Sequence, residues 1–480
     1  MQTRKDLLQA HRLMTQRASQ ALMLGEPDTP EQPMRRLNVA SFIGVMVAIL
    51  VMAGFGIIGL IRNGGSTQGL EEPGAIIIEK ETGARYIWCL DGSRKLCPVA
   101  NYTSAKLLSG ADASKQHLVS RDSLAKYDRG QTVGIPGAPD TLPDAKKLVK
   151  MPWSACVRAA DLPNGGHTSL VTLVAGKAVG GNPLPAYQAI VVQADQQPWV
   201  IWHNKRMRVS AQALPALTST ASVPKVAPKW LNALTPGADF RAPAIPGLGQ
   251  NTTGPNGRGR VGQVFTVPNV TGTNAASYVL MADGLAPVSD IEARLLTIDP
   301  AVKAALGDQA GPYRINPDAF SGAPKHAGSI TNPDLQGGMP GFITYSDTTP
   351  LCATYSDVSG NAGAQVTLGA ALSTPPDNAY GGASNADQLI FPPGGAALVG
   401  VLPGQGKRDE INTVFLVTDG RRFALQSKDV AQKLGYTLST DAVPVPAGVV
   451  GLIPNGPILD PTAARNPIVQ AGQPSAQPTG

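Results

Sequence analysis

Histidine and charged residues are both scarce in this chain. Asp, Glu, Lys and Arg make up 15% of its 480 residues, against about 25% in a typical soluble protein. The five histidines show no metal-ligand spacing with one another, and neither an H-E-x-x-H nor a G-x-S-x-G motif occurs. These absences argue against a zinc hydrolase and against a hydrolase with a G-x-S-x-G nucleophile turn. No metal site and no catalytic residue is therefore predicted.

A basic surface for nucleic acid is also lacking. The formal net charge is +6, but half of this excess lies in residues 1–36 together with Arg62. The charges of the remaining residues are close to balanced, so a nucleic-acid partner is not expected.

Complete nucleotide-binding motifs are absent as well. The nearest P-loop candidate is residues 400–408, GVLPGQGKR. Its first glycine stands one residue too early for G-x-x-x-x-G-K, and Arg408 occupies the place of the Ser or Thr that would hold magnesium. A G-x-G-x-x-G occurs at Gly257, Gly259 and Gly262, but a strand-like run follows where a helix is required, so we interpret it as a linker. No cofactor is predicted, and ATP binding is doubted.

What the chain does have is one long apolar run, residues 39–61, VASFIGVMVAILVMAGFGIIGLI. At a rise of about 1.5 Å per residue it would reach about 35 Å, enough to cross a hydrocarbon core. A secretory signal peptide is the rival interpretation. Its apolar core is usually only ~7–15 residues long, however, and RNGGST at residues 62–67 offers no A-x-A cleavage site. We therefore expect a retained transmembrane helix.

The flanks of the apolar run predict its orientation. Residues 1–36 carry six Lys and Arg residues, whereas residues 62–81 carry Arg62 and Lys80 beside four glutamates. Because basic flanks stay in the cytoplasm, the long C-terminal part is predicted to be extracytoplasmic. Four cysteines without a C-x-x-C motif fit disulfides in an oxidising compartment.

Two helix faces are candidates for contacts with partners. Residues 4–24 form an amphipathic pattern, which suits either a helix on the lipid headgroups or a partner-binding helix. Ala40, Gly44 and Ala48 repeat at four-residue spacing inside the apolar run. Small residues at this spacing let a second membrane helix approach closely, so we expect them to mediate packing in the membrane.

The rest of the chain is rich in turns and weakly repetitive. Glycine (53) and proline (42) together make up about a fifth of the sequence, short of the ~25–30% typical of disorder. Apolar runs lead into a tight turn at residues 86–94, 199–206, 278–284 and 414–422. A short helical pattern follows each turn, and a Gly- and Pro-rich strand closes three of the units, with only residues 313–317 at that place in the third. Because Asp-Gly between apolar runs favours a type I′ hairpin, we predict four diverged copies of a small α+β module.

Two stretches, residues 145–196 and 325–410, interrupt the repeats. They contain Cys156 and Cys352 respectively, and strand-like runs at residues 169–175, 189–193, 341–345 and 365–368. The two stretches could pair into one discontinuous β-rich central domain, which a Cys156–Cys352 disulfide would pin. Cys89 and Cys97 flank the first Asp-Gly turn, where they could form a local bridge or remain two buried thiols.

The order and spacing of several motifs resemble one family. They are the basic amphipathic N-terminus, the single membrane helix, the strand-turn units, VGIPGAP at residues 133–139, WVIW at 199–202, LIPNGP at 452–457 and two widely spaced cysteines. Because these motifs occur in this order, the chain resembles EccB over essentially its whole length. EccB is a membrane component of the type VII (ESX) secretion systems of actinobacteria and mycobacteria. The resemblance implies periplasmic repeats around a central domain closed by one disulfide, here Cys156 with Cys352. The Cys89 and Cys97 pair departs from the family pattern.

The resemblance also implies partners and a cellular location. EccC, EccD and EccE would share the inner-membrane complex, with EccC as its ATPase, the mycosin protease would lie nearby, and the outer domain would associate with copies of itself. Two other functions stay open. Family members are sometimes described as ATPases, and the basic turns at residues 94–95, 205–208 and 421–422 could bind anionic cell-wall polymers. The absence of a catalytic signature favours a structural subunit over an enzyme.

We therefore predict an α+β protein with a single transmembrane helix, followed by an extracytoplasmic domain of about four small α+β repeats around a discontinuous central β-rich domain. The predicted domains are residues 1–36 (cytoplasmic amphipathic helix and linker), 37–62 (transmembrane helix), 63–144 (first repeat), 145–196 (central domain, first part), 197–250 (second repeat), 260–322 (third repeat), 325–410 (central domain, second part), 411–460 (fourth repeat) and 461–480 (disordered tail).

Overall fold

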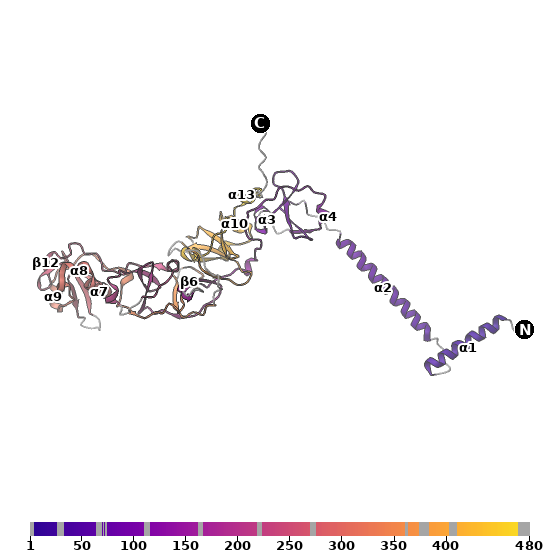
Figure 1. Cartoon of the computed structure of the whole chain (residues 1–480), viewed down its shortest axis with the longest axis horizontal. Coiled ribbons are helices and arrows are strands. Elements are labelled where there is room, and N and C mark those ends of the chain that lie inside the picture. Colours follow the sequence, from indigo (N-terminus) through magenta and orange to yellow (C-terminus); the bar gives the residue numbers. More distant parts are fainter. Residues whose placement is uncertain are drawn as a thin grey trace, which may run out of the picture. The chain divides into compact units, whose positions relative to one another are not determined.

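The computed structural model of the chain is drawn in Figure 1. It describes residues 4–25, 33–63, 70, 72, 74–109, 116–161, 167–217, 223–268, 275–360, 363–373, 384–402 and 410–468. The chain divides into two compact units. The first comprises Met1–Glu71, Glu79–Thr82 and Leu118–Lys126, and the second comprises Glu72–Ile78, Gly83–His117 and Tyr127–Gly480.

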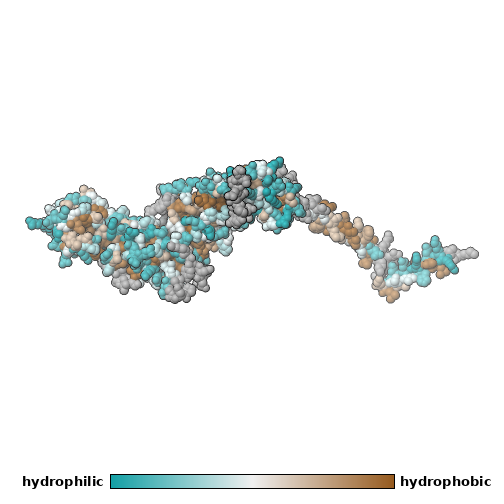
Figure 2. Space-filling view, turned by 45° about the horizontal axis from the view of Figure 1, so that its top comes forward, coloured by the Kyte–Doolittle hydropathy of each residue, from teal (hydrophilic) through white to brown (hydrophobic). Residues whose placement is uncertain are grey.

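Two long helices, α1 (Arg4–Leu24) and α2 (Pro33–Asn63), lie in the first unit. α1 covers the segment for which the amphipathic pattern predicts a helix. Within α2, residues Arg36–Gly59 have a mean hydropathy of 2.5, and none of them is buried. Figure 2 shows this apolar surface along the helix. By length and composition, α2 can cross a membrane.

The first unit also contains a short helix, α4 (Arg121–Leu124), and the chain around Glu79. The hydroxyl of Ser120 caps α4 by accepting a hydrogen bond from the backbone N–H of Ser123. Nε of Arg121 lies 2.8 Å from Oε1 of Glu79, whose side chain is 4% exposed. This ion pair satisfies a carboxylate that is almost removed from water.

Four small sheets repeat one topology, in which three consecutive strands form an antiparallel meander. The meanders are β1 (Ile76–Glu79), β2 (Arg85–Trp88) and β3 (Leu96–Pro98); β8 (Gln188–Ala194), β9 (Gln197–Trp202) and β10 (Lys205–Arg208); β14 (Val264–Val267), β15 (Ala276–Met281) and β16 (Gly284–Val288); and β22 (Ala397–Leu402), β23 (Val414–Thr418) and β24 (Arg421–Ala424). A helix follows each third strand, namely α3 (Tyr102–Ser109), α5 (Leu214–Leu217), α7 (Asp290–Ile298) and α10 (Lys428–Lys433). The prediction of four α+β modules is confirmed.

After its helix, the chain returns parallel to the first strand of the meander. β17 (Tyr313–Arg314) pairs with β14, and β25 (Ala442–Pro446) pairs with β22. In the second repeat, Lys225 bridges to Gln193 of β8 in the same direction. A closing segment then bridges in parallel to the third strand, at Arg129, at β11 (Thr235–Pro236), at Lys325 and at Asn455.

The closing segment of the third repeat differs from the expected one. The sequence pattern placed the closing segment of the third repeat at residues 313–317. β17, which lies within these residues, is instead the returning strand that pairs with β14. The closing segment is the chain at Lys325, which bridges to Leu285. Gly284 allows this approach, because a Cβ there would lie 2.5 Å from the carbonyl oxygen of Pro324. The segment contains Gly322, Pro324 and Gly328, so its composition is like that of the other three, but α9 (Pro317–Gly322) separates it from the position where the pattern placed it.

The type I′ turn expected from the sequence is present in two of the four hairpins. Both central residues have positive φ at His203–Asn204 (48° and 60°) and at Asp419–Gly420 (50° and 70°). Lys205 pairs with Trp202 across the former turn, so the turn contains two residues.

The first and third hairpins have other turns, and the type I′ expectation is wrong there. In the first, Asp91 lies within a longer loop, in which Gly92 and Arg94 have positive φ. In the third, Met281 pairs with Gly284, and the intervening Asp283 does not have positive φ. An Asp-Gly pair therefore locates these turns but does not determine their type.

The two stretches that interrupt the repeats form one six-stranded sheet in the order β21-β6-β5-β19-β20-β7. Its strands are β5 (Trp153–Asp161), β6 (His167–Ala175), β7 (Asn182–Pro183), β19 (Leu351–Tyr355), β20 (Gln365–Leu368) and β21 (Gln388–Ile390). β19 pairs with β5 antiparallel, which joins the two halves of the chain. The central domain is discontinuous, as the sequence predicted.

Two strands that we expected in the central sheet belong to the second repeat. β8 and β18 (Gly341–Phe342) pair in parallel in the sheet β11-β10-β9-β8-β18. The reason is local: β8 leads through a two-residue turn at Asp195–Gln196, with φ of 47° and 63°, into β9. The hairpin thus takes β8 away from the central sheet, and the fourth repeat similarly takes β22, which we had placed in the central domain.

Shorter elements complete the described chain. They are β4 (Gln116–Val119), η1 (Ala145–Lys147), α6 (Pro228–Leu231), β12 (Asn251–Gly254), β13 (Gly257–Arg260), α8 (Pro300–Leu306), η2 (Gly307–Ala310), α9 (Pro317–Gly322), η3 (Pro333–Leu335), α11 (Leu438–Asp441), α12 (Ala447–Val450) and α13 (Pro461–Ala464).

The hydrophobic cores run from one sheet into the next. Buried Trp153 and Tyr355 of the central sheet share a cluster with Val399 of the fourth repeat. A second cluster joins Leu107 of the first repeat to Leu416 of the fourth. Figure 1 shows the corresponding helices, α3, α10 and α13, close together. The outer domain is therefore held together by shared cores and not by linkers alone.

The predicted disorder after residue 460 is wrong for residues 461–468. Asp460 caps α13 by accepting a hydrogen bond from the N–H of Thr462, and Ala464 is fully buried. Further along, the N–H of Ile468 donates to the carbonyl of Thr132 at 2.8 Å. The Asp-Pro helix start was hidden by the polar composition of the tail. Residues 469–480 lie outside the described chain.

Candidate functional site

The small-residue face of α2 is exposed. Ala40, Gly44 and Ala48 lie about one turn apart, and a Cβ built at Gly44 would meet nothing within 4 Å. The structure contains one chain, so the packing role of this face stays a prediction.

The disulfide between Cys156 and Cys352 fixes the central sheet. The two residues lie directly opposite each other on β5 and β19, and both are fully buried. Val174, Val179 and Ala370 pack around them. The bridge spans 196 residues of sequence, and closing so long a loop stabilises the fold by about 5 kcal/mol in the loop-entropy model.

Cys89 and Cys97 also form a disulfide, so the local bridge is present and not two thiols. It connects the end of β2 with β3 over eight residues. Gly130 covers the bridge: a Cβ at this position would lie 2.5 Å from Sγ of Cys89 and 2.6 Å from Sγ of Cys97. The closing segment of the first repeat therefore packs its backbone directly on the disulfide.

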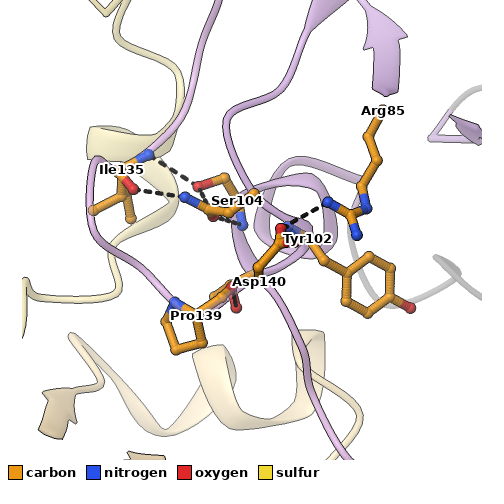
Figure 3. Close-up of polar contacts among 8 residues, drawn as sticks. Arg85, Tyr102, Ser104, Ile135, Pro139 and Asp140 are labelled. Atoms are coloured by element: carbon orange, nitrogen blue, oxygen red, sulfur yellow. Dashed lines mark hydrogen bonds and ion pairs between the residues drawn. The ribbon is translucent and has the colours of Figure 1, made fainter. Parts of the chain in front are cut away.

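The VGIPGAP loop of the first repeat is held by side chains at the start of α3 (Figure 3). Nδ2 of Asn101 donates to the carbonyl of Ile135 at 2.8 Å, and Oγ of Ser104 accepts from the N–H of Ile135 at 2.9 Å. Oγ1 of Thr103 donates to the carbonyl of Pro139 at 2.6 Å. These buried polar groups satisfy one another, so the loop is part of the fold and not an open site.

Asp140, which follows this loop, anchors it from the other side. Its Oδ1 accepts from Nη1 of Arg85 at 2.6 Å and from the N–H of Tyr102 at 3.1 Å, and Figure 3 shows the three residues together. The first strand pair, the helix and the closing loop of the repeat thus meet at one carboxylate.

In two of the three basic turns proposed as polymer-binding sites, those at residues 205–208 and 421–422, an arginine has partners within the protein. Nη1 of Arg206 lies 3.1 Å from Oδ1 of Asn232, and burial lowers the pKa of this guanidinium. In the fourth repeat, Nε of Arg422 donates to Oδ1 of Asn455 at 2.7 Å, and Nη1 donates to the carbonyl of Val450 at 2.8 Å. Asn455 belongs to the LIPNGP motif. Arg422 therefore holds the closing segment of the fourth repeat in place, whereas Arg206 contacts the end of α6.

The two glycine-rich motifs do not form nucleotide sites in the described residues. Gly400 lies within β22, and a Cβ at this position would come 2.7 Å from the side chain of Ile411. Residues 403–409, which include most of the P-loop candidate, lie outside the described chain. Gly257 and Gly259 lie in β13, which pairs with β12, so the stretch is a hairpin and the linker interpretation is wrong. Within the described ranges, no three His, Cys, Asp or Glu side chains are grouped to hold a metal ion.

The comparison with protein families decides where this architecture belongs. The family described as "Type VII secretion system ESX-1, transport TM domain B", EccB, matches residues 1–468. The chain belongs to the EccB family of type VII secretion systems. The match includes the membrane helix, all four repeats and the central sheet, so the whole described architecture is that of an EccB protein.

Individual EccB proteins are similar over nearly their whole length. The ESX-3 secretion system ATPase EccB3 of Mycolicibacterium smegmatis is 27% identical, covering 93% of this chain and 87% of its own. The ESX-2 secretion system ATPase EccB2 of Mycobacterium tuberculosis is 27% identical, covering 91% and 90%. Among solved structures, a chain of the intact ESX-5 inner membrane complex has a TM-score of 0.63 at 23% identity, covering 100% and 98%, and a chain of the EccB3 dimer from the ESX-3 core complex has 0.61 at 24%, covering 81% and 99%. These structures share the fold.

One connection between the second repeat and the central sheet was missed at the sequence level. Nζ of Lys229, in α6, lies 2.8 Å from Oδ1 of Asp387, beside β21. In the same helix, Nε1 of Trp230 donates to the carbonyl of Ala155 in β5 at 2.9 Å. The sequence PKWL shows a proline helix start and a tryptophan. It does not indicate what Lys229 and Trp230 contact, because their partners lie 158 and 75 residues away in the sequence.

Proposed function

We propose that this chain is a membrane-anchored structural subunit of a type VII (ESX) protein secretion complex in the inner membrane. The observation that carries the proposal is that the family match includes anchor and outer repeats together, over residues 1–468. Chains of the same fold occur in an intact ESX-5 inner membrane complex and in an EccB3 dimer. In this proposal α2 crosses the membrane and the repeats assemble with further copies of the chain.

The proposed orientation has the N-terminus in the cytoplasm and the repeats in the periplasm. The excess of Lys and Arg in residues 1–36 supports it, because basic flanks remain on the cytoplasmic side. The two disulfides support it independently, since such bridges persist in oxidising compartments.

The proposed partners are EccC, EccD and EccE in the membrane, and the mycosin protease near the repeats. α1 offers exposed apolar side chains at Leu7, Leu8 and Met14, and α2 offers the small-residue face. Exposed apolar residues on an amphipathic helix are suited to docking on a partner helix.

Deletion of residues 1–36 tests this function. We expect the outer domain to stay folded, with Cys156 and Cys352 still protected from thiol reagents, but to leave the complex on native gels. Deletion of residues 469–480 is the control, and we expect it to leave the complex intact. Full retention of the complex by the first deletion would count against the docking role.

Hydrolysis of ATP is a separate candidate, because the names of the relatives carry it. The purified full-length chain should then turn over ATP and lose this activity on Lys407→Ala. Absence of turnover above the buffer rate would remove this candidate. Contact with the cell wall is tested by salt-sensitive sedimentation of the chain with insoluble peptidoglycan.

A further inference from the structure

A cavity of about 630 Å³ lies beside the Cys89–Cys97 disulfide of the first repeat. Small-molecule sites in proteins typically measure about 300–1,000 Å³, so this cavity has the size of a ligand site. Its apolar wall consists of the disulfide together with Ile87, Leu90, Leu108, Val133 and Pro467. Neither the membrane helix nor the central disulfide contributes to it.

Backbone hydrogen bonds fix the wall of the cavity. The N–H of Cys89 donates to the carbonyl of Lys95, and the N–H of Gly130 donates to the carbonyl of Leu96, each at 2.9 Å. Val133 and Pro467, which both line the cavity, form an antiparallel bridge, so the C-terminal segment contributes to the wall. The site is therefore formed before any ligand arrives, so binding would not require the wall to be ordered.

The charges at the cavity are mainly positive. Lys95, Arg129 and Arg465 line it, against one carboxylate, that of Asp91. Hydrogen bonds from Ser93 lower the pKa of Asp91, so this carboxylate is ionised at neutral pH and offsets one of the three cations. The guanidinium of Arg129 is placed by stacking over the ring of Tyr86, 4.1 Å from its centroid. The lining thus keeps an excess of positive charge beside an apolar interior.

We propose that this cavity binds an amphipathic anion, a hydrocarbon chain that ends in a carboxylate or a phosphate. The apolar wall removes the chain from water, and the cations hold the charged head by charge-assisted hydrogen bonds. A neutral amphiphile would not use the cations, and a cationic one would face three like charges. This inference goes beyond a structural role, because it gives the first repeat a ligand of its own.

Photolabelling of the full-length chain tests the proposal. The chain is placed in nanodiscs of zwitterionic phosphatidylcholine and irradiated with a fatty acid that carries a diazirine in its chain. We expect labelled peptides to contain residues 87–97, 129–133 or 465–467. Labelling confined to α2 would overturn the proposal.

Competition identifies the head group. Laurate and dodecyl phosphate should displace the probe, and 1-dodecanol should compete about tenfold more weakly, because hydrogen bonds to a charged group contribute more than neutral ones. Displacement by one of the two anions alone would assign the head group as carboxylate or phosphate. Equal competition by the alcohol would contradict the proposed role of the cations.

Two variants separate binding from folding. The double variant Arg129→Gln with Arg465→Gln should reduce cavity labelling about tenfold, whereas Arg294→Gln with Lys303→Gln, exposed cations of the third repeat, should leave it unchanged. Leu90→Glu changes a side chain that is 57% exposed and adds a negative charge at the wall, so it should also reduce labelling. Non-reducing peptide mapping checks that Cys89–Cys97 is intact in each. Unchanged labelling in both test variants would refute the site.

Discussion

Nζ of Lys229 and Oδ1 of Asp387 form an ion pair at 2.8 Å, and the two side chains are only 9% and 7% exposed. Oδ2 of the same carboxylate accepts a hydrogen bond from the N–H of Val171 in β6, also at 2.8 Å. Lys229 belongs to α6, which lies within the second repeat, and Asp387 precedes β21 of the central sheet. One pair of charges therefore ties the second repeat to the central sheet across 158 residues.

Removing one member of this pair should destabilise the chain strongly. Asp387→Ala leaves the charge of Lys229 buried without its carboxylate, and we expect it to lower the free energy of unfolding by about 3–5 kcal/mol. Urea unfolding followed by circular dichroism measures the effect. The control Asp161→Ala removes a carboxylate that is 84% exposed and should stay within about 0.5 kcal/mol of the original chain.

The double variant Lys229→Met with Asp387→Leu makes the prediction more specific. It removes both charges together, so it should be more stable than Asp387→Ala alone. If the double variant is at least as unstable as the single one, the cost comes from lost packing and from the lost hydrogen bond of the N–H of Val171, and not from the charge of Lys229.

The two disulfides should contribute unequally to stability. Their loops span 196 and 8 residues, which correspond to about 5 and about 2.5 kcal/mol in the loop-entropy model. Cys156→Ala with Cys352→Ala should therefore lower the free energy of unfolding by more than Cys89→Ala with Cys97→Ala. Urea midpoints of the two double variants give the comparison, and equal losses would contradict the argument from loop length.

Gly130 should not tolerate a side chain. A Cβ there would lie 2.5 and 2.6 Å from the two sulfur atoms of the first-repeat disulfide, so Gly130→Ala should cost about 1–3 kcal/mol through overpacking. Gly322→Ala is the control, since its Cβ would meet nothing within 4 Å and lies in a helix, where alanine is favoured. Equal stability of the two variants in thermal unfolding would show that the disulfide can move aside.

Local patterns were enough to predict several parts of this fold. The apolar run predicted α2 because a membrane span depends on composition and length alone, and the helical spacing of residues 4–24 predicted α1. Turn residues between apolar runs located all four hairpins. The discontinuous central sheet could also be predicted, because two stretches interrupt the repeats and each carries one cysteine of a disulfide that could join them.

Other parts depend on contacts that no local pattern specifies. β8 has the composition of a central strand, and its two-residue turn into β9 draws it into the second repeat. Asp387 is one of many acidic residues in the sequence, and its importance comes from burial against α6. The tail at Ala464 and Ile468 is polar enough to suggest disorder, but it docks on the first repeat. Burial and distant pairing, which determine these features, arise only when the chain is folded.

Acid should weaken the second repeat through Asp334. Its Oδ1 lies 2.5 Å from Nζ of Lys205 and its Oδ2 accepts from the N–H of Ala238 at 2.9 Å. The hydrogen bond from Lys205, followed by that from Ala238, lowers the pKa of Asp334 below 3.8. In acid the unfolded chain then binds more protons than the folded chain, so this contribution is present above pH 3.8 and is lost as pH falls through the lower, folded pKa.

Asp334→Asn tests this pH dependence. At pH 7 we expect the variant to be less stable by up to about 1 kcal/mol, since the pair is partly exposed. The difference from the original chain should shrink as the pH falls below 3.8 and through the lower, folded pKa of Asp334, because both chains then lack the charge. Urea unfolding at several pH values measures this gap, and a gap that stays constant as the pH is lowered until the chain unfolds would contradict the assignment.

The small-residue face of α2 should be sensitive to bulk. Ala48→Leu fills the face formed by Ala40, Gly44 and Ala48, and it should weaken the association of membrane helices, because close approach of the backbones is then blocked. Ala53→Leu is the matched control, because it adds the same bulk on the side of the helix opposite to this face. Both positions lie in the exposed window of α2. Crosslinking of the full-length chain in membranes should show less complex with Ala48→Leu than with Ala53→Leu. Equal yields from the two variants would mean that α2 does not use this face, and assembly would then depend on α1 and the outer repeats.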